Sequence, residues 1–205
     1  MNNTVALTKI RQEILDNNVC PALAEQATQL VFGAGNTNAK IVFIGEAPGK
    51  KEDETGLPFM GASGKFLNEL LLTIGLNRED IYITNIVKYR PPNNRDPSKV
   101  EKAEFLPYLM QQLDIIKPKV VVTLGRHSME QFLPEVKISQ AHGQKFTIKA
   151  LGDKDQSNKT QSDSKMQANT DEIILIPLYH PAVALYNGSM RQILQDDFAN
   201  LKQFL

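Results

Sequence analysis

Residues 41–45 read IVFIG, and three further runs of similar character follow along the chain: IYITNI at 81–86, VVVTL at 120–124 and IILIPL at 173–178. Each run is short, rich in β-branched residues and apolar at most positions, so both faces of the strand must be buried. Parallel strands that are covered by helices on both sides have this pattern. The four runs therefore predict a largely parallel sheet.

Helical patterns separate these runs. Ser63 can cap a helix that ends at Gly75, and a second helix is expected over residues 98–116, where Pro107 must kink it or start it afresh. A short helix is expected at 126–133 and a last one from Ser189 to the carboxyl terminus. Strands that alternate with helices predict a three-layer α/β/α sandwich with a central, mainly parallel four-stranded sheet.

Length and composition narrow the class of protein. With 205 residues the chain has the size of one α/β domain, and we expect residues 1–205 to form one. Lys and Arg together equal Asp and Glu at 23 each, so any nucleic-acid surface must be local. The single Cys20 excludes a disulfide framework and any site of several thiolates, which fits a reducing compartment. No apolar run is long enough to span a bilayer, so we expect a cytoplasmic protein.

One segment does not fit the core pattern. Residues 151–171 read LGDKDQSNKTQSDSKMQANTD, with three apolar side chains among 21 residues and no periodicity. Such a stretch buries too little surface to offset the entropy of ordering it. We expect a mobile insertion there.

The unusual residues gather where strands should end. Residues 45–65 carry five glycines and two prolines, residues 88–97 form a stiff basic loop, and Tyr-His-Pro follows the last run at 179–181. Each stretch alone has an ordinary explanation: a strand-to-helix connection, a solvated charge cluster and a structural histidine. Ligands of parallel α/β sheets bind beyond the carboxyl ends of the strands. The three strand ends together are therefore expected to form one site.

The same stretches resemble a known family. GEAPG at 45–49, PFMGASG at 58–64, ITNIVKYRPPNNRDP at 83–97 and YHPA at 179–182 resemble the family 4 uracil-DNA glycosylases, in the same order and at similar separations. The resemblance runs from about residue 31 to residue 182 and resumes loosely in the final helix. It implies a monomeric DNA repair enzyme whose partner is uracil-containing DNA. Such an enzyme flips uracil out of the helix and hydrolyses its N-glycosidic bond, leaving an abasic site.

The resemblance assigns catalytic roles to two residues. Glu46 sits at the acidic position of the first motif and would help to order the attacking water. His180 matches a strand-end histidine that would donate to uracil O2, where negative charge develops. Ala47 occupies the place of a water-activating Asp in family 1 enzymes, so bond breaking would run ahead of water attack.

The resemblance also implies a uracil-binding set. Phe59 matches the aromatic residue that stacks on the flipped base. Asn85 matches the uracil reader, whose amide accepts from N3–H and donates to O4, a pattern that opposes cytosine. Glu52 matches a residue thought to exclude the methyl group of thymine, and Gly45 and Ala47 complete the set.

Contacts to DNA are expected from the surrounding loops. A wedge must fill the gap that the flipped base leaves. Ala184, where the family has a bulky residue, is too small, so Leu185 is preferred over Val183 and Tyr186. A second departure, His-Gly at 142–143 in place of Arg-Gly, would weaken one phosphate or pocket contact. The expected DNA-binding residues are Gly61, Ser63, Lys88, Arg90, Arg95, Pro181 and Leu185.

A further departure concerns metal. Family 4 enzymes hold a four-iron four-sulfur cluster through four cysteines, and Tyr89 and the neighbourhood of Phe105 stand at two of these positions. With Cys20 as the only thiol, the cluster cannot form. No metal or other cofactor is therefore expected, and Tyr89 and Phe105 should fill the space.

Two other functions compete with this interpretation. The first is a non-catalytic or differently specific member of the same superfamily. Relatives that bond covalently to uracil-DNA carry a basic insertion with a histidine after the second strand, and KYRPPNNRDPS at 88–98 contains none. The second is a nucleotide- or phosphate-binding α/β module that uses only the GEAPG loop. That function would leave Phe59, Asn85 and His180 unexplained.

Overall fold

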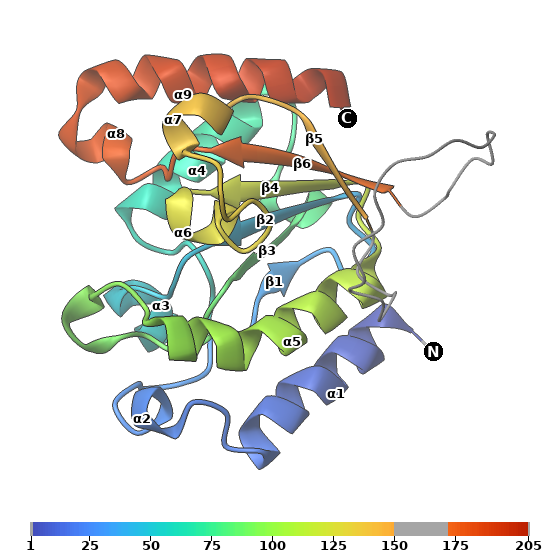
Figure 1. The fold of residues 1–205 in the computed structure, drawn as a ribbon, viewed down its shortest axis with the longest axis vertical. Coiled ribbons are helices and arrows are strands. Elements are labelled where there is room, and N and C mark those ends of the chain that lie inside the picture. The colour runs from blue at the N-terminus through green and yellow to red at the C-terminus, as the bar shows by residue number, and fades with distance from the viewer. Residues whose placement is uncertain (1, 150–171, 205) are drawn as a thin grey trace.

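Four buried parallel strands form the centre of this computed structural model, which describes residues 2–149 and 172–204 (Figure 1). They lie side by side in the order β3 (Tyr82–Asn85), β2 (Ile41–Gly45), β4 (Val120–Leu124) and β6 (Glu172–Leu178). The predicted strands and their parallel arrangement are confirmed. The sheet has six strands instead of four, because β1 (Ala34–Gly35) and β5 (Phe146–Lys149) pair antiparallel at its two edges. Both are too short to stand out as apolar runs.

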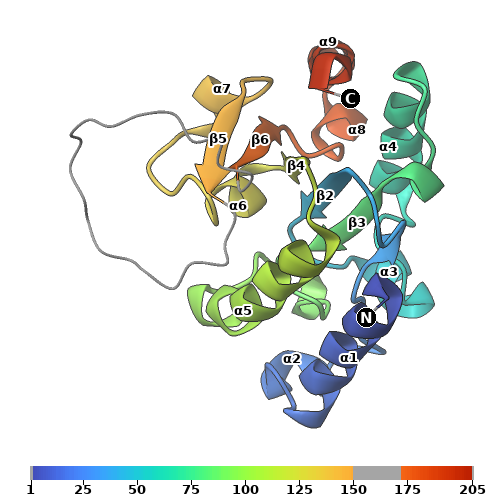
Figure 2. The ribbon, with the colours of Figure 1, turned by 90° about the vertical axis from the view of Figure 1, so that its right-hand side faces the viewer.

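Helices cover both faces of the sheet, as Figure 2 shows. On one face α4 (Ala62–Thr73) and α9 (Gly188–Leu201) pack against alternate strand residues such as Phe43 and Val122. On the other face α1 (Asn3–Asp16) and α5 (Lys99–Ile116) pack against the residues between them, such as Val42 and Val121. Side chains alternate across a strand, so one apolar run supplies both cores. The three-layer α/β/α prediction is confirmed.

Shorter elements complete the described chain. They are α2 (Pro21–Ala24), α3 (Lys50–Thr55), α6 (Arg126–Met129), α7 (Ile138–Ala141), α8 (Val183–Tyr186) and the 3₁₀ turns η1 (Arg78–Asp80), η2 (Pro92–Asn94) and η3 (Lys202–Phe204). In residues 2–149 and 172–204, no helix has both the length and the apolar character that a membrane crossing requires.

Some helix boundaries differ from expectation. Pro107 lies inside an uninterrupted α5, which buries Phe105, Leu109 and Leu113 along one face; this packing outweighs the backbone hydrogen bond that proline removes. The helix expected at 126–133 ends at Met129. Helix α1 was not predicted, although Leu7, Ile10 and Ile14 have helical spacing. The expected mobile insertion at 151–171 lies outside the described residues.

Candidate active site

The loops that follow β2, β3 and β6 enclose a cavity of about 440 Å³ at the carboxyl edge of the sheet. The strands are parallel, so their carboxyl ends share this edge, and the three strand ends do meet in one place. The residues that were singled out from the sequence and that line the cavity are Glu46, Ala47, Glu52, Phe59, Ser63, Asn85, Arg95, His180 and Tyr186.

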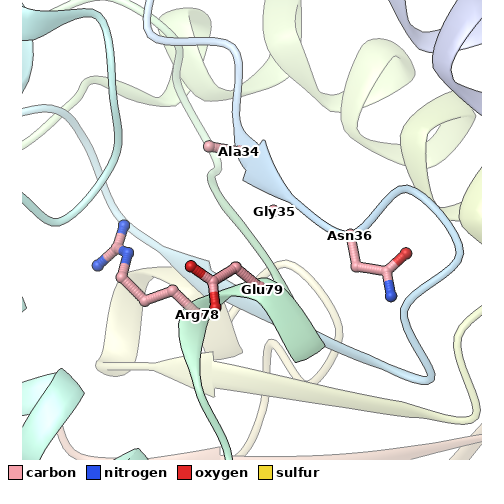
Figure 3. Close-up of a pocket in the computed structure, with 5 residues that line it drawn as sticks. All are labelled: Ala34, Gly35, Asn36, Arg78 and Glu79. Carbon is pink, nitrogen blue, oxygen red and sulfur yellow. The ribbon is translucent and has the colours of Figure 1, made fainter.

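A second cavity of about 440 Å³ lies between β1 and η1 (Figure 3). Its lining consists of Ala34, Gly35, Asn36, Arg78 and Glu79. The guanidinium of Arg78 is already engaged, because it donates to two backbone carbonyls and to the side chain of Asn68. The candidate chemistry therefore belongs to the first cavity, which we call the carboxyl-edge pocket.

Phe59 is held rigidly in the carboxyl-edge pocket. Its ring stacks with that of His180, with centroids 5.6 Å apart and planes inclined by 29°. Its φ of 55° lies in the left-handed region, which is unfavourable for a non-glycine residue. Arg78 donates to the carbonyls of Phe59, at 3.1 Å, and Pro58, at 2.6 Å, and a Cβ at Gly64 would collide with the Phe59 carbonyl. These contacts maintain the strained backbone and thus the position of the ring.

Asn85 is the last residue of β3 and pairs in register with Gly45, the last residue of β2. The side chain of Asn85 is 2% exposed. A Cβ at Gly45 would collide with the Asn85 side-chain oxygen and would lie 2.7 Å from the Phe59 ring. Gly45 is buried and does not line the pocket, but its missing side chain lets Asn85 and Phe59 approach each other.

Glu52 connects the two halves of the loop between β2 and α4. One carboxylate oxygen accepts from the backbone N–H groups of Met60, at 2.7 Å, and Gly61, at 2.8 Å, and the other accepts from that of Gly49, at 3.0 Å. Glu52 lines the pocket and is also buried. Its carboxylate is therefore committed to shaping the loop.

His180 follows β6, and the backbone sets its tautomer. The N–H of Ala182 donates to Nδ1 of His180 at 3.1 Å. A neutral imidazole that accepts at Nδ1 carries its proton on Nε2. Burial lowers the pKa of His180 to about 4, and the charge of Glu52 opposes this shift only in part. Near neutral pH, His180 is an uncharged side chain with an Nε2–H donor.

Glu46 is a second carboxylate that lines the pocket. Its side chain keeps 28% of its surface exposed, so it faces the cavity from a partly buried position. Burial raises the pKa of Glu46, while the charges of His127 and Arg126 act in the opposite direction. Ala47, the next residue, has no group that could activate water. Glu52 is occupied by backbone amides, and the third carboxylate that lines the pocket, Asp96, pairs with Arg126 and His127, so Glu46 is the carboxylate best placed to face a ligand.

A match to a protein family covers most of the chain. The family model described as the uracil DNA glycosylase superfamily matches residues 32–204. The chain belongs to this superfamily.

Three relatives that share one name match this chain over most of their length. The type-4 uracil-DNA glycosylase of Sulfurisphaera tokodaii is 42% identical over 201 residues, which cover 97% of this chain and 84% of the relative. Those of Archaeoglobus fulgidus and Thermotoga maritima are 39% and 37% identical, each match covering 96% of this chain and 92% and 93% of the relative. This member of the uracil DNA glycosylase superfamily thus groups with the type-4 proteins.

Lys88 corrects one expectation for this superfamily member. We expected a DNA contact, but its side chain is fully buried. Its ammonium group donates to Thr84 Oγ1 at 2.6 Å, to the Asn85 carbonyl at 2.8 Å and to Gln112 Oε1 at 2.6 Å. Burial lowers the pKa of Lys88 well below its ordinary value. Lys88 therefore ties the end of β3 to α5 beneath Asn85 and cannot reach a phosphate.

The other residues expected to contact DNA differ in how exposed they are. Arg90 is partly exposed and donates to Asn94 Oδ1 at 2.8 Å, while Arg95 is exposed and paired in a bidentate manner with Glu101. Gly61 and Ser63 lie at the start of α4, next to the pocket. Pro181 is buried, which corrects its expected DNA contact, because it has little surface to offer.

Two exposed side chains lie in α8, just after His180. Leu185 is 43% exposed and Tyr186 is 90% exposed. Tyr186 lines the carboxyl-edge pocket, whereas Leu185 is not among the residues that line it. The structure thus brings Tyr186, an alternative in the sequence analysis, closer to the pocket than the preferred Leu185.

Aromatic packing fills the region where the resemblance to family 4 would place iron–sulfur ligands. The rings of Tyr89 and Phe105 meet edge to face, with centroids 5.9 Å apart, and belong to the same buried cluster as Cys20. Burial is the main cause that raises the pKa of Cys20 to about 11. The donor set does not fit a four-thiolate cluster, because the sequence holds one cysteine.

The sequence did not indicate that polar side chains cluster around Glu46 at the edge of the pocket. Asp96 and His127 lie beside Glu46, and His127 lies in α6, shortly after the end of β4. The position of His127 just after a strand end was an available signal, since β4 ends at the same edge as β2. The contacts of Arg78 with the Phe59 loop had no comparable signal.

Proposed function

We propose that this protein is a uracil-DNA glycosylase that flips uracil out of DNA and hydrolyses its N-glycosidic bond, leaving an abasic site. The observation that carries the proposal is the convergence of Phe59, Asn85 and His180, from three separate strand ends, on one pocket. A glycosylase must stack, read and polarise the flipped base. These three side chains supply one group for each task.

Base recognition is assigned to Phe59 and Asn85. The ring of Phe59, held by Arg78, offers a fixed face on which the flipped uracil stacks. The amide of Asn85 accepts from uracil N3–H and donates to O4, whereas cytosine presents the opposite groups at both atoms. Lys88 supports this reader by holding the Asn85 carbonyl.

Bond cleavage is assigned to His180. Its Nε2–H donates to uracil O2, where charge accumulates as the bond to the sugar breaks. The Ala182 amide fixes the required tautomer, and burial keeps the ring neutral. A neutral donor that is already oriented needs no reorganisation during the reaction.

Glu46 is assigned to the attacking water and to the positive charge that develops on the sugar. Because Ala47 supplies no strong base, bond breaking runs ahead of water attack and the sugar becomes positively charged. An ionised Glu46 carboxylate then stabilises this charge and orders the water that attacks C1′. Glu52 bounds the same pocket and closes it to the methyl group of thymine.

DNA handling is assigned to exposed groups around the pocket. Arg90 and Arg95 face the phosphate backbone, and Gly61 and Ser63 present the start of α4. Tyr186 is the wedge that we favour over Leu185, because it is large, 90% exposed and at the pocket rim.

We further propose that the enzyme acts as a monomer in the cytoplasm. All groups assigned to catalysis come from one chain, and a single buried thiol suits a reducing compartment. Light scattering at several protein concentrations tests the oligomeric state.

Incubation with a labelled oligonucleotide that contains one uracil, followed by alkali, tests the function directly. We expect strand cleavage at uracil and none at cytosine or thymine placed in the same sequence. The His180→Ala variant is the control for a contaminating glycosylase and should lose most of the cleavage. An absence of cleavage with protein in excess over DNA would refute the proposal.

A further inference from the structure

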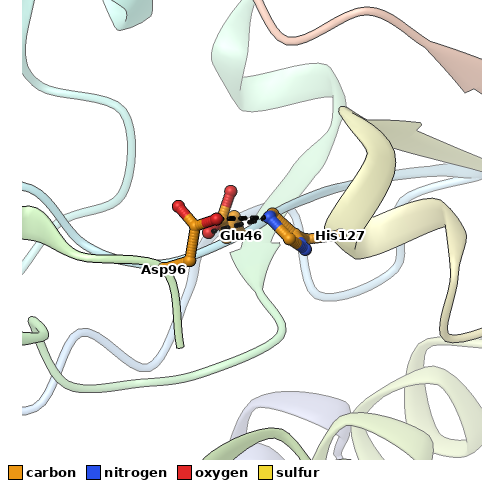
Figure 4. A group of neighbouring side chains, drawn as sticks. All are labelled: Glu46, Asp96 and His127. Carbon is orange, nitrogen blue, oxygen red and sulfur yellow. Dashed lines mark hydrogen bonds and ion pairs between the residues drawn. The ribbon is translucent and has the colours of Figure 1, made fainter. Parts of the chain in front are cut away.

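His127 comes from a fourth strand end and contacts Glu46 and Asp96, which both line the carboxyl-edge pocket. It belongs to α6, which follows β4, while Glu46 follows β2 and Asp96 lies in the loop after β3 (Figure 4). His127 Nε2 is 3.0 Å from Asp96 Oδ2 and 3.8 Å from Glu46 Oε1. The side chain of His127 is 14% exposed, while those of Glu46 and Asp96 are 28% and 63% exposed.

The surroundings of the His127 ring are predominantly acidic. Its Nδ1 is buried, and the nearest acidic acceptor is Glu130 Oε2 at 3.5 Å. Both ring nitrogens thus lie near carboxylates, and a ring nitrogen that carries a proton can donate to one of them. The charged groups around His127 and Glu46 are Asp96, Glu130, Arg126 and Lys102.

Arg126 lies close to both His127 and Asp96. Its Nε lies 3.2 Å from His127 Nε2 and its Nη2 lies 3.2 Å from Asp96 Oδ2. Arg126 can donate to Nε2 only when His127 is neutral, whereas Nε2 can donate to Asp96 only when it carries a proton. Protonation therefore determines whether the ring faces the two carboxylates as a donor.

We propose that His127, held by Asp96, is a positioning residue that keeps the Glu46 carboxylate ionised and oriented at the mouth of the uracil pocket. This inference rests on the proposed function, because it assigns a partner to the group that faces the water and the sugar. It adds a residue that none of the four sequence motifs contains.

The direction of the charge effect supports this role. Burial raises the pKa of Glu46, and the charge of His127 is the largest influence that lowers it. Asp96 acts on Glu46 in the opposite sense, so its contribution is to hold the ring rather than to ionise Glu46. Without His127, a larger fraction of Glu46 would be protonated at a given pH.

The test is the pH dependence of uracil excision under single-turnover conditions, for the parent and for His127→Gln. The rate should fall at low pH as Glu46 takes up a proton. An opposite charge within about 4–6 Å changes a carboxyl pKa by about one unit or more, so in His127→Gln this fall should begin about one pH unit higher. At a pH on that limb, the variant should be about tenfold slower than the parent.

Two further variants separate charge from packing. His127→Lys retains a positive charge and should restore the parental limb at least in part. His142→Gln removes the other histidine that pairs with an aspartate, at 3.0 Å from Asp197, and should leave the position of the limb unchanged. An unchanged limb in His127→Gln would overturn the inference.

Two other outcomes lead to different conclusions. Loss of the parental rate in a chelator would overturn the inference by assigning Glu46, Asp96 and His127 to a bound cation. A parent that excises no uracil at any pH would refute the proposed function itself, and the inference with it. An active parent with an unmoved limb refutes only the role of His127.

Discussion

Acid should destabilise the parent protein more than a variant in which His180 is replaced by Asn. In the fold, burial lowers the pKa of His180 to about 4, whereas the unfolded chain titrates near 6.5. Below about pH 6.5 the unfolded state therefore binds a proton that the folded state excludes. This stability is present above pH 6.5 and is lost as the pH falls toward 4.

The magnitude follows from the difference between the two pKa values. Each pH unit between them changes the free energy of unfolding by about 1.4 kcal/mol. Between about pH 7 and about pH 4.5, the His180 contribution should therefore fall by about 2.5 kcal/mol. That is a large part of the stability of a typical domain.

Urea unfolding followed by circular dichroism measures this effect in the parent and in His180→Asn at both pH values. The stability of the parent relative to the variant should fall by about 2.5 kcal/mol on acidification. His180→Gln cannot titrate either and should behave like His180→Asn, which separates titration from packing. A relative stability that stays constant within about 0.5 kcal/mol would refute the claim that the fold holds His180 neutral.

Three other changes test the site. Asn85→Asp should lose most uracil excision and gain slow excision of unpaired cytosine, because a protonated carboxyl group can accept from N4 and donate to N3; near-parental single-turnover activity on uracil would contradict this. Lys88→Met should leave the salt dependence of DNA binding unchanged. It should lower the free energy of unfolding by about 1–3 kcal/mol, because buried acceptors lose their donor. In the control variant Arg90→Ala, the slope of the logarithm of the DNA-binding constant against log salt should become smaller in magnitude by about 0.9. Tyr186→Ala should reduce excision from duplex DNA several-fold more than from single strands, and more than Leu185→Ala does; an equal loss on both substrates would show that Tyr186 is not the wedge.

The central fold could be predicted because its signals are local. The runs at 41–45 and 120–124 coincide with β2 and β4, since a strand buried on both faces must be apolar throughout. The edge strands and α1 have weaker patterns, because each has one side in solvent. The meeting of three strand ends followed from the parallel sheet alone.

The side-chain details depend on contacts between distant parts of the chain. Lys88 looked like a loop cation, and its burial depends on Gln112, which lies 24 residues further along in α5. The contact between His127 and Asp96 joins residues 31 positions apart. The left-handed backbone of Phe59 depends on Arg78, 19 residues away. The hydrophobic periodicity of a sequence does not indicate contacts between residues so far apart.

The aromatic filling around Cys20 has a consequence for how uracil repair is supplied. An enzyme that depends on an iron–sulfur cluster depends on iron uptake and on cluster assembly, and oxidants can disable it. Here Tyr89 and Phe105 occupy that region, and the remaining thiol is buried, with a pKa raised to about 11 that leaves little reactive thiolate. Excision by this protein should therefore continue under iron starvation and peroxide stress, conditions that would disable an enzyme built on such a cluster.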